Sequence, residues 1–553
     1  MDTYSSQGTR IPLSEALIKR LGQGTNMTTT SSDDKMTQTS SEKMTKTVSD
    51  KIEVTTTEVD VGDKDEAIAM VGEQKHVYDP AVAARAVRKI DWYLLPAMLF
   101  GMGLTWYDKA ILGAAVLFDM TTDLSLLIPD RSTVPPTVDS SRLSWATSIF
   151  YFGFLAGLYP MSFALQRFPL GRILGVVVVV WAGVCLSTAG VTSYQGLYVN
   201  RFFLGFVESI IPSGFMCIVS SYYTQREQAL RQSWWLCSSG IFAIAGSGLN
   251  WGFAQVQGGG LHRWQYIYLL AGSLTFLFGI LCFALPNSPC SAWFLTPEER
   301  FAAVERLRDG QTGIRCTKFK MAHVKESMLD VKVWLIFVMM ITLYMINGAT
   351  SGFGPLIVST FGWNTLESIL FQLPLGAASF LSTLTAGYLG TRFQGIRCLM
   401  LAAFCLPVIC GCLIIWKSEW SYHAPAPVVG YAITGLTGGA ATLIVVVGMS
   451  NVAGHTKKSF MSATIYFGYC IGNIIGPQLI RSQTKAQHYP EVWLSLVISF
   501  TICASCSITL YFVLRRANAR KAASVGDHDE AERAKMAFQD LTDIENPYFR
   551  YSL

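Results

Sequence analysis

The chain has 553 residues, of which 51% are hydrophobic and 15% are charged. An ordinary soluble domain is about 25% charged, so this composition indicates a membrane protein with many spans. The net charge of +5 does not indicate nucleic-acid binding, because the Lys and Arg residues gather between apolar segments, where they orient a membrane protein. The seven His residues are scattered without the spacing of a metal site. With no nucleophile and base gathered at one face, we expect no enzyme, cofactor or metal.

The first 84 residues are rich in Ser, Thr, Asp, Lys and Glu and poor in apolar residues. Such a segment buries too little apolar surface to fold, and it contains no signal-peptide core. We predict a disordered cytosolic tail over residues 1–84.

From Ile90 onward, the chain carries hydrophobic runs of about 20 residues or more, the length that spans about 30 Å of hydrocarbon. We predict an all-α membrane protein with twelve transmembrane helices, six on each side of a polar centre. The halves are residues 85–286 and 332–515, joined by a cytosolic central loop at 287–331 and followed by an unstructured cytosolic tail at 516–553. The spans fall at about 90–118, 143–165, 172–190, 197–223, 232–256, 264–285, 332–358, 367–390, 396–416, 427–451, 459–480 and 491–514.

Basic residues occupy alternate connections between these spans. Arg85, Arg88 and Lys89 precede the first span, and Arg515 and Arg516 follow the last. Because basic loops stay on the cytosolic side, we expect both termini to be cytosolic. We expect a multi-pass monomer in the plasma membrane.

The central loop carries a strong helix-start signal. Thr296 can cap the helix, Pro297 fits its first position, and Glu299 stands three residues after the Thr, as in a capping box. Apolar residues then recur at every third position from Phe301 to Leu307 among charged ones. This pattern predicts an amphipathic helix that lies either on the membrane surface or in a soluble linker.

Two similar basic turns stand at the same place in each half. Arg167 and Arg172 bracket the turn after the second span, and Arg392 and Arg397 bracket the turn after the eighth. Such an internal repeat supports the division into six and six spans, and we expect these turns to act as gating loops.

Several motifs between Arg85 and Arg516 resemble those of a known family. They are RKID at 88–91, YDK at 107–109, RFFLGFVE at 201–208, FLTPEER at 294–300, ERLR at 305–308 and YCIGNIIGPQ at 469–478. With the twelve spans, they resemble the major facilitator superfamily, and within it the anion:cation symporters of the fungal allantoate-permease type. The resemblance implies two halves that rock about a central site. It also implies proton-coupled symport of a small organic anion, such as a carboxylate or a ureido acid, by alternating access.

The chain departs from this family at two places. The superfamily usually has an Asp before the Arg of its first cytosolic loop, where this chain has Gln166 and, in the second half, Thr391. Gating through that Asp is therefore in question. Lys109 stands where bacterial and animal relatives tend to have Arg, and a compact ammonium relaxes the geometry of carboxylate binding.

Four ionisable residues lie deep within predicted spans, away from their ends: Asp108 and Lys109 in the first, Arg201 and Glu208 in the fourth. Each costs roughly 2.5 to 3.5 kcal/mol at bilayer depth, so such residues face a protein-lined interior and usually function there. Arg201 and Glu208 share a helix face about 10 Å apart, too far to pair. Each therefore needs a partner on the first span, either Lys109 for Glu208 and Asp108 for Arg201, or only one of these.

The resemblance implies roles for these charges. Asp108 and Glu208 couple proton movement to an anion that Lys109 and Arg201 attract, while static interhelical salt bridges are the alternative. Tyr151, Asn347, Tyr469 and Asn473 are further substrate-binding candidates, although a polar residue in a span often only joins helices. Asn347 and Asn473 each adjoin a Gly- and Pro-rich break, where transporters build sites. We expect coupling in the first half and selectivity in the second.

Two other functions fit the same sequence. A proton-antiport exporter of a metabolite or drug would use the same fold and charges. A non-transporting nutrient sensor would typically carry a long folded cytosolic domain, which the short polar tails do not indicate.

Overall fold

The computed structural model describes residues 66–72, 76–115, 120–126, 128–130, 137–139, 141–254, 260–308, 319–359, 371–420, 424–479, 489–524, 536 and 539–553. All of them belong to one compact unit, residues 62–553. Most of the tail predicted to be disordered lies outside the described residues. Within that tail, however, Glu66–Val71 forms helix α3.

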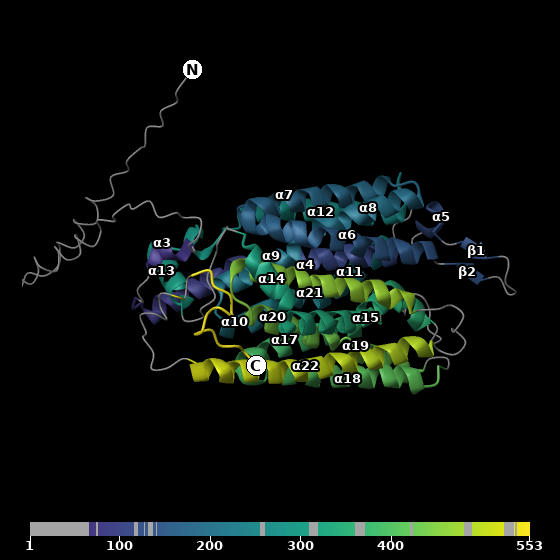
Figure 1. Cartoon of the computed structure of the whole chain (residues 1–553). Coiled ribbons are helices and arrows are strands. Elements are labelled where there is room, and N and C mark those ends of the chain that lie inside the picture. The colour runs from purple at the N-terminus through teal and green to yellow at the C-terminus, as the bar shows by residue number, and fades with distance from the viewer. Residues whose placement is uncertain are drawn as a thin grey trace, which may run out of the picture. The chain divides into compact units, whose positions relative to one another are not determined.

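The first half of the bundle is built from long helices (Figure 1). A short antiparallel hairpin, in which Ile128 pairs with Asp139, precedes its second span. No sequence pattern predicts this hairpin, because its strands are three residues long and one contains a proline, which weakens a strand signal. The elements are α4 (Pro80–Ala115), α5 (Thr121–Asp123), β1 (Ile128–Asp130), β2 (Thr137–Asp139), α6 (Ser141–Arg167), α7 (Leu170–Ser187), η2 (Thr188–Gly190), α8 (Tyr194–Glu208), α9 (Ile210–Tyr222), α10 (Gln225–Leu236), α11 (Ser238–Ala254) and α12 (Arg263–Cys282).

The second half follows a linker of short helices. The linker holds η3 (Pro289–Ser291), α13 (Pro297–Glu305) and α14 (Met321–Leu329). The second half holds α15 (Val331–Ser359), α17 (Gln372–Arg392), η5 (Gln394–Ile396), α18 (Arg397–Lys417), α19 (Pro425–Thr434), α20 (Thr437–Ser450), α21 (His455–Gln478) and α22 (Pro490–Ser524).

Within the described residues, these helices form twelve spans, because α8–α9, α10–α11 and α19–α20 each make one span in two pieces. Eight of the spans are long and apolar enough by themselves to cross a membrane. The other four are α4, α10–α11, α17 and α21; the first three contribute residues to a cavity described below. The predicted all-α fold of two six-helix halves is confirmed.

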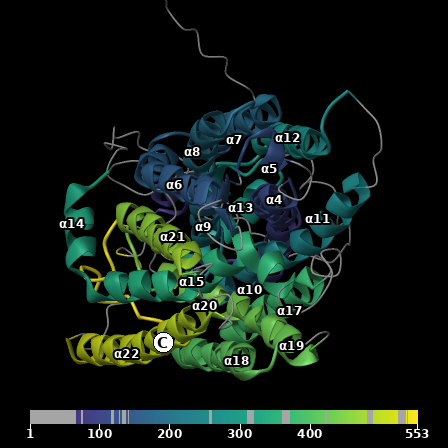
Figure 2. The ribbon, with the colours of Figure 1, turned by 90° about the vertical axis from the view of Figure 1, so that its right-hand side faces the viewer.

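Burial separates inner spans from outer ones. In α8–α9 and α19–α20, 78% and 72% of the most apolar stretch is buried, against 39% in α7 and α18 and 33% in α22. Both views place α7 and α12 on one side of the bundle and α18 and α22 on the other (Figures 1 and 2). The outer spans therefore turn apolar surface toward lipid, while the inner ones surround the centre.

The fourth span breaks immediately after Glu208, and the break has a local cause. Helix α8 ends at Glu208 and α9 begins at Ile210. Pro212, four residues after Glu208, has no N–H with which to bond the Glu208 carbonyl. This break places Glu208 at a helix end in the bundle interior.

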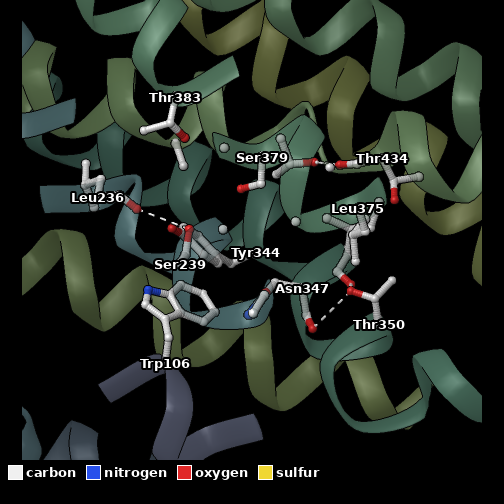
Figure 3. A pocket seen from close by; sticks show the side chains of 18 of the residues that line it. Trp106, Leu236, Ser239, Tyr344, Asn347, Thr350, Leu375, Ser379, Thr383 and Thr434 are labelled. Atoms are coloured by element: carbon white, nitrogen blue, oxygen red, sulfur yellow. Dashed lines mark hydrogen bonds between the residues drawn. The ribbon is translucent and has the colours of Figure 1, made fainter. Parts of the chain in front are cut away.

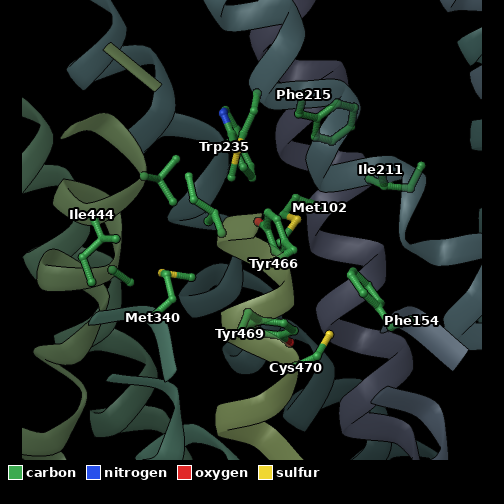
Figure 4. Close-up of a cluster of buried hydrophobic side chains, with 14 of the residues drawn as sticks. Met102, Phe154, Ile211, Phe215, Trp235, Met340, Ile444, Tyr466, Tyr469 and Cys470 are labelled. Carbon is green, nitrogen blue, oxygen red and sulfur yellow. The ribbon is translucent and has the colours of Figure 1, made fainter. Parts of the chain in front are cut away.

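The two halves are joined at the end of the bundle that holds α13, α14 and residues 539–553, here called the linker end. Gln166 Nε2 donates to Thr456 Oγ1 at 3.1 Å, and Gln225 Nε2 donates to the Ser450 carbonyl at 3.0 Å. Buried side chains from both halves, among them Phe154, Trp235 and Tyr466, pack together deeper in the bundle (Figure 4). The described conformation is thus closed toward the linker end.

The predicted helix of the central loop is confirmed as α13, with its capping box. The Thr296 side chain accepts from the Glu299 N–H at 3.3 Å. Val304 of this helix, and Leu307 just after its end, are buried against α3. This packing favours the linker-helix alternative over a helix lying on the membrane surface, because protein rather than lipid covers the apolar face.

Residues 539–553 correct a prediction. The C-terminal tail is expected to be unstructured, but this part of it packs against the linker end of the second half. Asp543 is fully buried between Lys332 and Lys457, and Phe549 is also fully buried. The sequence does not reveal this packing because the segment is short and has no regular apolar period, and what holds it is contact with other parts of the chain: charges around Asp543 and apolar burial of Phe549.

Candidate functional site

A cavity of about 240 Å³ lies between the two halves. The first half lines it from α4, α6, α10 and α11, and the second half from α15, α17 and the α19–α20 span. Figure 3 shows side chains from both halves pointing into this space. A cavity between two six-helix halves is where transporters of this architecture hold their substrates.

Lys109 is the only charged side chain among the described residues that line the cavity. It forms an ion pair with Glu208 Oε1, and it also donates to the Thr105 carbonyl at 3.3 Å. The side chain of Lys109 is 14% exposed and that of Glu208 is 1% exposed. The ammonium therefore faces the cavity, and the carboxylate lies behind it.

Both partners keep unused hydrogen-bonding capacity. An ammonium has three N–H donors, and Lys109 uses two of them within the described part of the chain. Glu208 Oε2 is buried without a hydrogen-bond partner. An unsatisfied buried carboxylate oxygen is costly, so the pair has room for an anion at Lys109 and for a proton at Glu208.

Three aromatic rings lie close to the ammonium of Lys109. Lys109 Nζ lies 5.7 Å from the ring centroid of Trp106, 5.2 Å from that of Phe150 and 6.0 Å from that of Phe154. Cation–π contacts of this kind hold a cation without neutralising it.

Asp108 and Arg201 occupy a second buried cluster. Asp108 accepts from Trp181 Nε1 at 3.1 Å and from the Cys185 thiol at 3.7 Å. Arg201 donates to the Tyr268 hydroxyl. No ion pair within 4 Å joins Asp108 to Arg201 in the described residues. Of the two pairings that the sequence leaves open, the structure forms only Lys109 with Glu208.

The remaining predicted substrate residues fall into two groups. Tyr151 and Asn347 line the cavity, whereas Tyr469, Asn473 and Arg201 are not among its described lining residues. The Tyr469 ring packs on Tyr151 at 5.8 Å and on Tyr344 at 4.6 Å, between centroids. Tyr469 thus lies just behind the cavity wall, in the aromatic cluster that joins the halves (Figure 4).

The wall from the second half carries hydroxyl and amide groups that are not among the predicted substrate-binding residues. Helix α17 supplies Gln372, Ser379 and Thr383, and α20 supplies Thr437 and Thr442. The sequence of α17 does contain a pattern that predicts a polar helix face, because its three polar residues are spaced by seven and four positions. Among its described lining residues, the cavity thus offers one cation and several uncharged hydrogen-bonding groups.

Close contact between α15 and α21 sets the position of Asn347 and Asn473. A Cβ at Gly472 would lie 2.5 Å from the Ile341 carbonyl oxygen, and one at Gly476 would lie 2.4 Å from that of Met345. The glycines therefore let the two backbones approach. As a result, Asn347 Nδ2 reaches Asn473 Oδ1 at 2.7 Å.

We expect Gly472→Ala to lower the free energy of unfolding by about 1–3 kcal/mol, as overpacking typically does. The added methyl group must displace backbone rather than a flexible side chain. Thermal unfolding of the purified protein measures the effect. The control is Gly248→Ala, because a Cβ there would meet nothing within 4 Å. Equal unfolding temperatures for the two variants would contradict the close contact.

Of the four predicted gating arginines, Arg167, Arg172 and Arg392 are exposed and Arg397 is fully buried. Arg397 donates to the Gly390 carbonyl at 2.7 Å, to Ser552 Oγ at 2.9 Å and to the Gln225 carbonyl at 3.2 Å. Since Gln225 belongs to the first half, Arg397 bridges the halves.

Gln166 stands where the family usually has an Asp. Its hydrogen bond to Thr456 also joins the first half to the second.

Two six-helix halves around a central cavity define an integral, multi-pass membrane protein of the secondary transporter class, not an enzyme. Residues 98–477 match the Major Facilitator Superfamily. The chain therefore belongs to this superfamily.

Similar proteins agree with this assignment. An uncharacterized transporter of Schizosaccharomyces pombe is 32% identical, over 86% of this chain and 90% of its own length. The thiamine pathway transporter THI73 of Saccharomyces cerevisiae is 29% identical, over 89% of this chain and 91% of its own length. The allantoate permease of the same yeast is 28% identical, over the same shares of each chain. The predicted resemblance to fungal permeases of the allantoate type is confirmed.

Solved structures confirm the fold. The proton:xylose symporter XylE has a TM-score of 0.59 and 12% identity, covering 77% of this chain and 95% of its own. The fucose:proton symporter FucP of Escherichia coli has a TM-score of 0.56 and 12% identity, covering 76% of this chain and 99% of its own. At such identity the likeness concerns the fold alone.

Proposed function

We propose that the chain imports a small organic anion, a carboxylate or a ureido acid, by proton-coupled symport across the plasma membrane. The observation that carries the proposal is the Lys109–Glu208 ion pair at the wall of the central cavity. The name of one relative, an allantoate permease, supports an anion as substrate. In this proposal the linker end, with both termini, faces the cytosol.

The pair supplies a mechanism of coupling. An anion that binds Lys109 competes with Glu208 for the ammonium, and the displaced carboxylate then takes up a proton. The empty site holds Lys109⁺ and Glu208⁻, while the loaded site holds Lys109⁺, the anion and neutral Glu208. Both states have no net charge, which matters because an uncompensated charge in a low-dielectric interior is costly. Glu208 therefore takes up one proton for each monoanion that binds at Lys109.

Asp108 serves in this proposal as a second proton-binding carboxyl, outside the substrate path. Its hydrogen-bond partners Trp181 and Cys185 are uncharged donors. Arg201 interacts with Asp108 electrostatically, without a direct bond. Arg201 is 2% exposed and bonded to Tyr268. We therefore assign Arg201 to the electrostatic surroundings of Asp108 rather than to direct contact with the substrate.

The proposal is tested with purified protein in liposomes that carry an imposed pH gradient. A panel of organic monoanions is offered, and we expect inward accumulation of at least one of them with the protons. Glu208→Gln should abolish gradient-driven accumulation but retain exchange of labelled for unlabelled substrate, because Lys109 remains to bind the anion.

Full pH-driven uptake by Glu208→Gln would contradict the proposed coupling. Accumulation against the proton flow would instead identify a proton-antiport exporter. A protein that binds an anion without moving it would be a sensor.

A further inference from the structure

The hydrogen bonds around Asn347 have a fixed direction, and this direction restricts the substrate. Asn473 Nδ2 donates to the Tyr469 backbone carbonyl at 2.8 Å. A backbone carbonyl can only accept, so the amide group of Asn473 cannot be turned around. Its Oδ1 must then face Asn347.

Asn347 is oriented in turn. Its Nδ2 donates to Asn473 Oδ1 at 2.7 Å, so its own Oδ1 points away from Asn473. In the described part of the chain this Oδ1 has no hydrogen-bond partner, and it is not among the buried polar atoms that lack one. Asn347 lines the cavity (Figure 3). The free carbonyl oxygen is therefore accessible from the cavity.

The surroundings make this orientation rigid. Asn473 is fully buried, and a Cβ at the neighbouring Gly348 would lie 2.8 Å from the Asn473 Cα. Because the helices touch here, neither amide has room to move apart and rotate. Asn347 thus offers its Oδ1 to the cavity as an acceptor in a fixed direction.

We propose that Asn347 Oδ1 selects substrates that carry an N–H or O–H donor in addition to their anionic group, and that Asn473 is the positioning residue that fixes this acceptor. The inference rests on the proposed function, in which Lys109 holds the anionic group from the other half. It narrows the substrate class from any small organic anion to a monoanion with a hydrogen-bond donor at a distance from its charge.

Pairs of acids that differ only in the donor test the proposal. Succinamate has amide N–H groups and N,N-dimethylsuccinamate has none; 4-hydroxybutanoate has an O–H and 4-methoxybutanoate has none. Dissociation constants are obtained from the ligand-induced rise in unfolding temperature of the full-length protein in lipid nanodiscs. We expect the donor-free member of each pair to bind about tenfold more weakly or worse, because it leaves a desolvated acceptor unpaired.

Variants then show which residues cause the preference for donor-bearing over donor-free acids. Asn347→Ala should bring the ratio of dissociation constants within each pair close to one. Asn473→Ala should do the same although Asn347 is intact, because the Asn347 amide can then turn. Asn473→Asp should restore the ratio, since a protonated Asp can donate to the Tyr469 carbonyl and accept from Asn347. The control is Asn250→Ala, which removes an intramembrane asparagine that bonds Tyr107 instead and should leave the ratio unchanged.

Equal binding of both members of each pair by the unaltered protein would overturn the inference, as would a ratio that survives Asn347→Ala. Absence of binding by both donor-bearing acids would also overturn it. These results leave the proposed function intact if other monoanions bind and their binding is lost in Lys109→Met. Failure of the whole panel would instead count against the proposed function.

Discussion

Lys109→Met is expected to abolish transport of organic anions and to lower the free energy of unfolding by about 3–5 kcal/mol, the usual effect of removing one partner of a buried ion pair. Glu208 is 1% exposed, so the substitution leaves a buried carboxyl without its ionic partner, and this carboxyl must either stay charged without compensation or take up a proton. The same change removes the only cation from the described lining of the cavity. Thermal unfolding and uptake by liposomes measure the two effects.

A double variant separates the two roles of Lys109. In Lys109→Met with Glu208→Gln, no uncompensated charge remains, so we expect most of the stability to return while transport stays absent. Lys89→Met is the matched control on the same helix. Lys89 pairs with Glu299 at 2.8 Å, but its side chain is 42% exposed, and exposed pairs contribute about 0–1 kcal/mol. Substantial uptake by the double variant would show that Lys109 does not bind the anion.

Asp543→Asn is expected to have the second largest effect, a loss of about 3–5 kcal/mol of stability, since it breaks a buried ionic cluster. Asp543 Oδ1 lies 2.8 Å from Lys457 Nζ, Oδ2 pairs with Lys332, and Oδ2 accepts from the Tyr551 hydroxyl at 2.8 Å. We expect a lower unfolding temperature and faster proteolytic cleavage within residues 539–553. Arg550→Gln is the control, because Arg550 belongs to the same segment and is exposed.

The same cluster predicts a pH dependence. Burial by itself raises the pKa of Asp543, but the charges of Lys332 and Lys457 outweigh it and hold the pKa below its ordinary value. A carboxyl with a lowered pKa in the folded state stabilises the fold above its unfolded pKa of about 3.9. This contribution is lost as the pH falls toward the lower, folded value. In Asp543→Asn the decline of stability below about pH 4 should therefore be shallower.

The segment 539–553 acts on the contacts that close the linker end. Arg397 binds the end of this segment: its backbone N–H donates to the Leu553 carbonyl at 2.7 Å, and its guanidinium donates to Ser552 Oγ. The same guanidinium also donates to the Gln225 carbonyl of the first half. Lys457, which binds Asp543, follows Thr456, the partner of Gln166. Loss of Asp543 should therefore also loosen the contacts between the halves.

The sequence predicts the candidate site in part. Asp108, Lys109, Arg201 and Glu208 stand out because a charge in an apolar span is rare and costly. The helical repeat even excludes a bond between Arg201 and Glu208. The uncharged wall from α17 and α20 does not stand out, because Ser and Thr in a span commonly bond their own helix, as Thr442 does to the Gly438 carbonyl. Only their position around the cavity distinguishes them.

The sequence by itself determines the membrane class, the twelve spans in two halves, the superfamily and the capped helix at Thr296. These properties depend on composition, run length and motifs, which are local along the chain. Only the tertiary structure decides that Lys109 pairs with Glu208, 99 residues away, that Arg201 turns to Tyr268, and that residues 539–553 are held at the linker end. The physical reason is that such pairings depend on which helix faces meet and how closely, and short-range periodicity does not contain that information.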